Sequence, residues 1–168
     1  CFKLTLFCLG GVIFLITNKY ESHIHNDPVI PVLFHFDIRK KGTPPFPHWH
    51  ESIELLLVME GEIVAMADAN KIVARAGEMI IINSGHMHST ECIGDIAKYY
   101  CLIIDKSICE EIGIYVEEIL FEPMSADVEL IDCYNRVKEE LQQQEELYRF
   151  AAKAAVIDLL VTLYRKHI

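Results

Sequence analysis

The sequence predicts a mainly β domain followed by a pair of α-helices, and two patterns carry that prediction. Between residues 29 and 104, short apolar runs alternate with turn residues, which is typical of an all-β sandwich or barrel. Between residues 124 and 168 there is no Gly or Pro, and apolar residues recur at steps of three and four, which is the helical period. We therefore predict a β domain over residues 19–122 and a helical segment over residues 123–168.

The strands come first in chain order. An extended run at 29–37 is followed by a proline-rich loop at 42–47. Short strands are then predicted at 53–59, 62–66, 71–74, 79–82 and 98–104. Turn residues separate these runs, and they include Gly61, Gly77, Gly85 and Gly94. No internal repeat is visible.

The helices follow residue 105. A short helix is predicted at 107–112, and 113–123 is irregular. Ser125 or Asp127 can cap the next helix. Its apolar stripe is Leu130, Tyr134, Val137 and Leu141, and the last helix carries the stripe Leu147, Phe150, Ala154, Ile157, Val161 and Tyr164. Core packing against the β domain and contact with a second copy are alternative uses of these stripes.

The two ends of the chain look cut. Residues 1–18 form an apolar leader, with Cys rather than Met at position 1. It is interpreted as sequence upstream of the real start, with a signal peptide or a membrane anchor as alternatives. The chain ends within a predicted helix, so we expect the natural protein to continue.

Composition excludes several classes of protein. The 168 residues carry a formal net charge of −10, so the chain by itself should not bind nucleic acid. A hydrophobic fraction of 52% excludes a disordered polar chain. The six cysteines form no C-x-x-C pair, which indicates buried free thiols in the cytoplasm rather than a secreted disulfide framework.

One group of histidine and glutamate residues has the spacing of a metal-binding site. His48, His50 and Glu54 lie at spacings that place them on one face of an extended segment. Two imidazoles and a carboxylate are good ligands for a divalent transition metal. His88 can supply a fourth ligand from another strand. Zn, Mn, Fe and Ni are all compatible with such a set.

These residues lie within two motifs. Residues 42–61 resemble the first motif of the cupin superfamily at every defined position, and residues 77–92 resemble the second. In the second motif, Asn83 and Cys92 stand where the family usually has Pro and Asn. The resemblance implies a cupin fold, a double-stranded β-helix or jelly-roll barrel with a central cavity, here followed by the helical pair.

A narrower resemblance covers residues 20–168. The runs 47–61 and 76–83, with the tail AAVIDLLVTLYRK, are similar to the ligand-binding and dimerisation domain of AraC-type transcription regulators. In that family, helices after the barrel mediate dimerisation and helix-turn-helix units beyond them bind DNA. The resemblance implies a homodimer that meets DNA only through a part missing from this chain.

Two functions from different classes follow. The first is a sensor domain in which a small molecule, such as a carbohydrate, binds near His48, His50, Glu54 and His88, with or without a metal, and no catalysis takes place. The second is a stand-alone metal-dependent cupin enzyme, an oxygenase or an isomerase, with the same four residues around the metal.

Other conspicuous residues have simpler interpretations. His86 is expected in a turn. His23 and His25 are expected in an arm before the barrel rather than in a second metal site. Trp49 is expected to pack on the side opposite His48.

Overall fold

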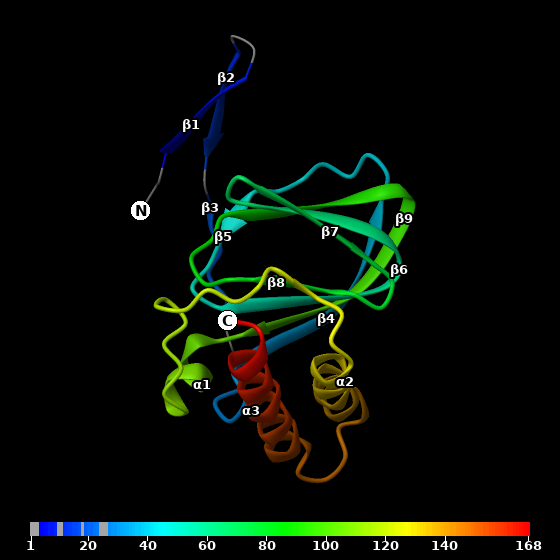
Figure 1. The fold of residues 1–168 in the computed structure, drawn as a ribbon. Coiled ribbons are helices and arrows are strands. Elements are labelled where there is room, and N and C mark those ends of the chain that lie inside the picture. Colours follow the sequence, from blue (N-terminus) through cyan, green and yellow to red (C-terminus); the bar gives the residue numbers. More distant parts are fainter. Residues whose placement is uncertain (1–3, 10–11, 18, 24–26) are drawn as a thin grey trace.

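The computed structural model describes residues 4–9, 12–17, 19–23 and 27–168. It confirms the predicted fold class, with a curled sheet followed by C-terminal helices (Figure 1). β1 (Leu4–Leu9) and β2 (Val12–Thr17) pair antiparallel in a separate two-stranded sheet. The assignment of residues 1–18 as a leader stays a prediction. Within the described residues, no helix has the length and apolarity needed to cross a membrane.

Two long strands build the main sheet, which is called the barrel below. β6 (Ile53–Ala67) pairs antiparallel with β9 (His88–Ile104), and bulges interrupt their register between Val58 and Glu62. Bulges bend strands and increase their twist. The two halves of β9 therefore follow the two halves of β6 around the bend, and the sheet curls.

Two predicted strand boundaries are wrong for the same reason. Residues 53–59 and 62–66 were expected as separate strands, but Gly61 lies inside continuous β6. Gly94 likewise lies inside β9, which begins ten residues before the predicted 98–104. Both glycines have positive φ, +76° and +84°. This conformation can end a strand at a turn or form a bulge within it, and the sequence does not distinguish these outcomes.

The other strands complete the sheet. β4 (Val32–Lys40) pairs with β9, and β7 (Asn70–Arg75) pairs with β6. β8 (Met79–Ile82) lies between β6 and β10 (Met124–Ser125), whereas the short β5 (His48–Trp49) joins β9 to β3 (Lys19–Tyr20). β8 matches its prediction, and β4 is shifted towards the C-terminus relative to the predicted 29–37.

Three helices cover one wall of the barrel (Figure 1). They are α1 (Lys106–Glu111), α2 (Val128–Gln143) and α3 (Tyr148–Lys166). Asp127 caps α2, because its carboxylate accepts hydrogen bonds from the backbone N–H groups of Glu129 and Leu130. Along β6, residues such as Leu55 and Leu57 face the helices, while Leu56 and Val58 face the barrel interior. The wall thus separates two hydrophobic cores.

The two predicted apolar stripes differ in burial. On α2, Leu130, Tyr134 and Val137 are buried against the sheet, as the core interpretation expects. On α3 the buried residues are Ala152, Val156, Leu159, Leu160, Thr162 and Leu163. None of them belongs to the predicted stripe, of which Leu147, Phe150 and Tyr164 are exposed and Ile157 is only partly buried against the core. Both faces of α3 are apolar, so periodicity alone could not select the buried one.

Candidate metal centre

Four side chains converge at one end of the barrel. His48 lies in β5, His50 in the loop after it, Glu54 on the inner face of β6 and His88 at the start of β9. His48 is paired with His88 in the sheet register. One ligand atom from each residue lies within 4.8 Å of the others. The structure therefore brings together all four residues predicted from the spacing.

The three imidazoles share one orientation, which backbone carbonyl groups impose. The Nδ1 atom of His48 lies 2.9 Å from the Phe46 carbonyl oxygen, that of His50 lies 3.1 Å from the Ser52 oxygen, and that of His88 lies 3.0 Å from the His86 oxygen. A carbonyl oxygen can only accept, so each Nδ1 carries the proton. Each Nε2 consequently faces away from these carbonyls.

Carboxylate oxygens face these inward nitrogens. Glu54 Oε2 is 3.0 Å from Nε2 of both His50 and His88. Glu21 Oε2 is 2.9 Å from Nε2 of His48. If an imidazole is neutral with its proton on Nδ1, its Nε2 presents a lone pair to a carboxylate. A proton or a metal cation is needed between the two for the contact to be attractive.

In the protein without metal, a proton can take the place of the cation between an imidazole and a carboxylate. Burial by itself would raise the pKa of the Glu54 carboxyl, but hydrogen bonds with His50 and His88 hold that pKa well below its usual range. Burial opposes the protonation of His88, and the contact with Glu54 outweighs it, so the pKa of His88 is raised. Burial and the neighbouring charge of His88 lower the pKa of His48. A proton shared by His88 and Glu54 thus stabilises the cluster.

The donor set fits a divalent transition metal. Three neutral imidazole nitrogens and one carboxylate are common ligands for such ions. Hydrogen bonds from Nδ1 to backbone carbonyls are the usual outer-shell support for metal-binding histidines. His50, Glu54 and His88 are almost completely buried, so their positions are held by packing. No cofactor is established, and metal binding stays a proposal.

Three residues around the cluster were not predicted from the sequence as part of it. The backbone N–H of Glu21 donates to the Trp49 carbonyl oxygen over 3.0 Å, which brings its carboxylate to His48. The His23 ring lies 4.7 Å from the His50 ring, centroid to centroid. The Cys101 thiol is 3.5 Å from Glu54 Oε1. Cys101 alternates with outward-facing residues along its strand, so the sequence could have indicated that it faces the interior. No local pattern indicates that Glu21 reaches the site.

The remaining predicted residues lie elsewhere. His86 pairs with Asp68 over 2.6 Å at a turn, as expected. Trp49 packs against Tyr20, with ring centroids 4.8 Å apart. His25 lies outside the described residues. Cys92, Cys101, Cys109 and Cys133 are free thiols, and the last three are buried.

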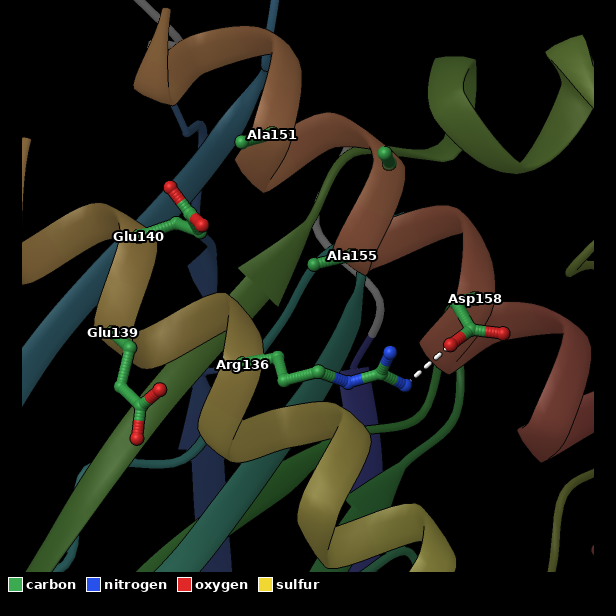
Figure 2. A pocket seen from close by; sticks show the side chains of 7 residues that line it. Arg136, Glu139, Glu140, Ala151, Ala155 and Asp158 are labelled. Carbon is green, nitrogen blue, oxygen red and sulfur yellow. Dashed lines mark hydrogen bonds and ion pairs between the residues drawn. The ribbon is translucent and has the colours of Figure 1, made fainter. Parts of the chain in front are cut away.

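The structure has a small cavity beside the cluster and a larger groove between two helices. A small cavity of about 50 Å³ adjoins the cluster and is lined in part by Glu21, His23 and His50. A larger groove of about 310 Å³ lies between α2 and α3. Figure 2 shows Arg136 reaching across this groove to Asp158, while Ala151 and Ala155 line it from α3. Among the described residues, the group found able to hold a metal ion is the His/Glu cluster and not the lining of this groove.

One family model matches most of the chain. A family model described as the AraC-like ligand binding domain matches residues 35–160. An uncharacterized HTH-type transcriptional regulator, YdeC of Bacillus subtilis, is 24% identical over an alignment that covers 60% of this chain. The alignment covers only 40% of that relative's length.

Cupin proteins occur among the similar solved structures. A cupin family protein with a double-stranded β-helix fold from Methanocaldococcus jannaschii has a TM-score of 0.40 and 16% identity, covering 44% of this chain and 69% of its own. A cupin 2 conserved barrel domain protein from Leptotrichia buccalis has a TM-score of 0.42 and 19% identity, covering 44% of this chain and 36% of its own.

Proposed function

The chain belongs to the family of AraC-like ligand binding domains, and from this premise we propose that it senses a small molecule for a transcription regulator. The observation that carries the proposal is the convergence of His48, His50, Glu54 and His88 inside the barrel. A few convergent polar groups at one end of an otherwise apolar interior are typical of a binding site for a small ligand or ion. The resemblance of this chain to an HTH-type regulator supports the regulatory setting.

A divalent transition metal is part of the proposed site. His48, His50 and His88 would bind it through Nε2, and Glu54 through Oε2. A bound metal supplies a fixed positive charge and open coordination positions for an effector. Glu54 orients two imidazoles at once, and the three backbone carbonyls keep the Nε2 lone pairs directed inward.

We propose that the chain forms a homodimer through the exposed face of α3. Leu147, the residue before α3, is 68% exposed, and Phe150 and Tyr164 on the helix are 61% and 45% exposed. Large apolar side chains gathered on one exposed face are typical of an interface. Binding of an effector would bias the arrangement of the two copies.

DNA binding is assigned to a helix-turn-helix part of the whole protein outside this sequence. The net charge of −10 disfavours contact between this domain and phosphate groups. A regulator of this kind acts at the chromosome, so we expect a cytoplasmic location. The effector is a small molecule, and a carbohydrate is one candidate.

A fusion reporter tests the proposal. The chain is joined to a monomeric helix-turn-helix domain and assayed on a promoter whose two half-sites require a dimer. We expect the fusion to occupy the promoter and small molecules to alter that occupancy. If the fusion binds no better than the helix-turn-helix domain alone, the proposed dimer is wrong.

A metal-dependent enzyme is the alternative, because the same four residues could bind a substrate through a metal. The α2–α3 pair argues against it, since a catalytic barrel does not require such a pair. Stoichiometric metal with turnover of a small substrate, both lost in His50→Ala, would favour the enzyme. Metal binding without turnover across a panel of organic acids and sugars would favour the sensor.

A further inference from the structure

A second polar layer crosses the barrel interior beside the candidate metal centre. Arg39 Nε is 3.4 Å from the Tyr99 hydroxyl, and Arg39 Nη2 is 3.2 Å from the Thr90 hydroxyl. Tyr99 and Thr90 are 2% and 7% exposed. Arg39 is paired in register with Ala97, a residue of the inner core. Paired residues of neighbouring strands share a face, so the Arg39 side chain lies on the interior face.

We infer that the effector of this barrel carries a carboxylate group, which the Arg39 guanidinium binds. This inference rests on the effector-binding role proposed above and specifies the ligand class.

The first support is an unused binding capacity. A guanidinium has five N–H donors, and Arg39 uses two of them, one to each hydroxyl. No carboxylate of the described residues lies within 4.0 Å of it. By contrast, Arg75, Arg136 and Arg149 each pair with a carboxylate although their side chains are more than half exposed. The charge of Arg39 lowers the pKa of nearby Asp37, but a half-buried arginine with no carboxylate in direct contact is unusual, since buried charges are normally paired.

The second support is geometry. Tyr99 and Thr90 hold Nε and Nη2, which leaves both N–H groups of Nη1 and one of Nη2 for a ligand. One N–H from each of these nitrogens makes the parallel fork that binds a carboxylate bidentately. The two hydroxyls thus fix the orientation of the fork, and a sugar hydroxyl would use it less completely than a carboxylate.

The third support is the position relative to the metal centre. Thr90 is two residues from His88 along β9, and Tyr99 is two residues from Cys101, which contacts Glu54. A step of two residues along a strand is about 7 Å. A compact organic acid can therefore span the distance between Arg39 and the His/Glu cluster.

The charges facing this position allow an anion. Asp37 is on the same face, and its carboxylate is 3.2 Å from the His35 ring. Contacts with His35 and Tyr99 and the nearby charge of Arg39 all lower the pKa of Asp37, so Asp37 offsets part of the charge of Arg39 without pairing with it directly. Glu54 is compensated by its contacts with His50 and His88. Arg39 remains the cation available to a ligand among the described residues of the inner face.

A thermal-shift titration tests the inference. The probes are acetate, lactate, succinate and benzoate, each beside its neutral amide and beside chloride at equal ionic strength, with inorganic phosphate as a separate arm. We expect at least one carboxylate to raise Tm by about 3–6 °C at ten times its Kd, while its amide does not. Arg39→Gln should weaken that binding at least about tenfold, and Arg39→Lys should restore part of it.

Lys40→Gln is the matched control, because Lys40 is the next residue, exposed and on the opposite face of β4. It should bind the carboxylate as the native protein does. The inference is overturned if no carboxylate shifts Tm beyond chloride, if phosphate alone does so, or if Arg39→Gln keeps full affinity. Zn²⁺ binding by Arg39→Gln separates the two proposals, since normal metal binding without carboxylate binding would refute only the ligand class.

Discussion

Glu54→Gln is the most informative substitution in the candidate metal centre. The Glu54 carboxylate is the only negative charge among the four proposed ligands, and its Oε2 atom lies 3.0 Å from both His50 Nε2 and His88 Nε2. Glutamine has nearly the same shape, so the barrel can keep its packing. It loses the charge and presents either a weaker oxygen ligand or an N–H group.

The expected magnitude follows from the number of ligands. Structural Zn²⁺ sites with four ligands bind with about 10–16 kcal/mol, which is about 2.5–4 kcal/mol for each ligand when divided equally. Loss of one ligand should therefore weaken Zn²⁺ binding by about 10²–10³-fold. His50→Ala should cause a loss of the same order. Native binding should also weaken as the pH falls, because protons compete for the Nε2 atoms, and the contact with Glu54 raises the pKa of His88.

Competition with a chromophoric chelator at neutral pH measures the affinity, and circular dichroism checks that each variant is folded. Two controls are matched by residue type. Glu51→Gln removes an exposed carboxylate that pairs with Lys106, and His86→Ala removes a ring that faces Asp68. Both should bind Zn²⁺ within about twofold of the native protein.

Two results would refute this reasoning. If the native chain does not bind one Zn²⁺, Mn²⁺, Fe²⁺ or Ni²⁺ ion per molecule, the cluster is a proton-linked polar network only. If the native chain binds metal but Glu54→Gln binds it equally well, the ion occupies another place.

Three further predictions concern assembly, the fold and pH. Phe150→Glu should convert the proposed dimer to a monomer in sedimentation experiments without loss of helicity, whereas Val128→Glu, at a residue 71% exposed on α2, should leave the dimer intact. Gly61→Ala should destabilise the protein in urea by more than the about 1 kcal/mol expected for Gly94→Ala. The reason is that an added Cβ would overlap the Ile96 carbonyl oxygen at Gly61 but meet open space at Gly94. Hydrogen bonds from the backbone N–H groups of Leu130 and Glu129 lower the pKa of Asp127, so its cap is fully effective above the unfolded pKa of about 3.8. The advantage of the native protein over Asp127→Ala in urea midpoint should therefore disappear as the pH falls through the lowered folded pKa, and a constant difference down to pH 2 would contradict this assignment.

The sequence could indicate the four candidate ligands because the pattern that they form is local, and the structure places them together. His48, His50 and Glu54 lie within seven residues, and alternation along an extended chain places their side chains on one face. His88 could be added because a second motif supplied it. Glu21 and Arg39 could not be found in this way, since their partners are distant in sequence and neither belongs to a local pattern.

The sequence predicted the fold class and most element types correctly. It failed where the same residue type is compatible with two structures, such as a glycine that can form either a turn or a bulge within a strand. Gly61 and Gly94 have the conformation of turn residues but form irregularities within long strands, and that outcome depends on the pairing of β6 with β9. On α3, two faces are apolar, and the position of the helix on the sheet decides which one is buried. Those decisions depend on contacts between residues far apart in the chain.

The sequence by itself therefore indicated that a region of strands is followed by helices, and it indicated the four candidate ligands and their common face, because each follows from spacing along the chain. Only the tertiary structure decided that β6 and β9 are continuous, that the outer face of α3 is left exposed, and that Glu21, Cys101 and Arg39 lie beside or near the cluster. The physical reason is that curling of the sheet brings the two ends of β9 to opposite walls of one interior. Side chains from distant segments meet there, at positions that no local periodicity encodes.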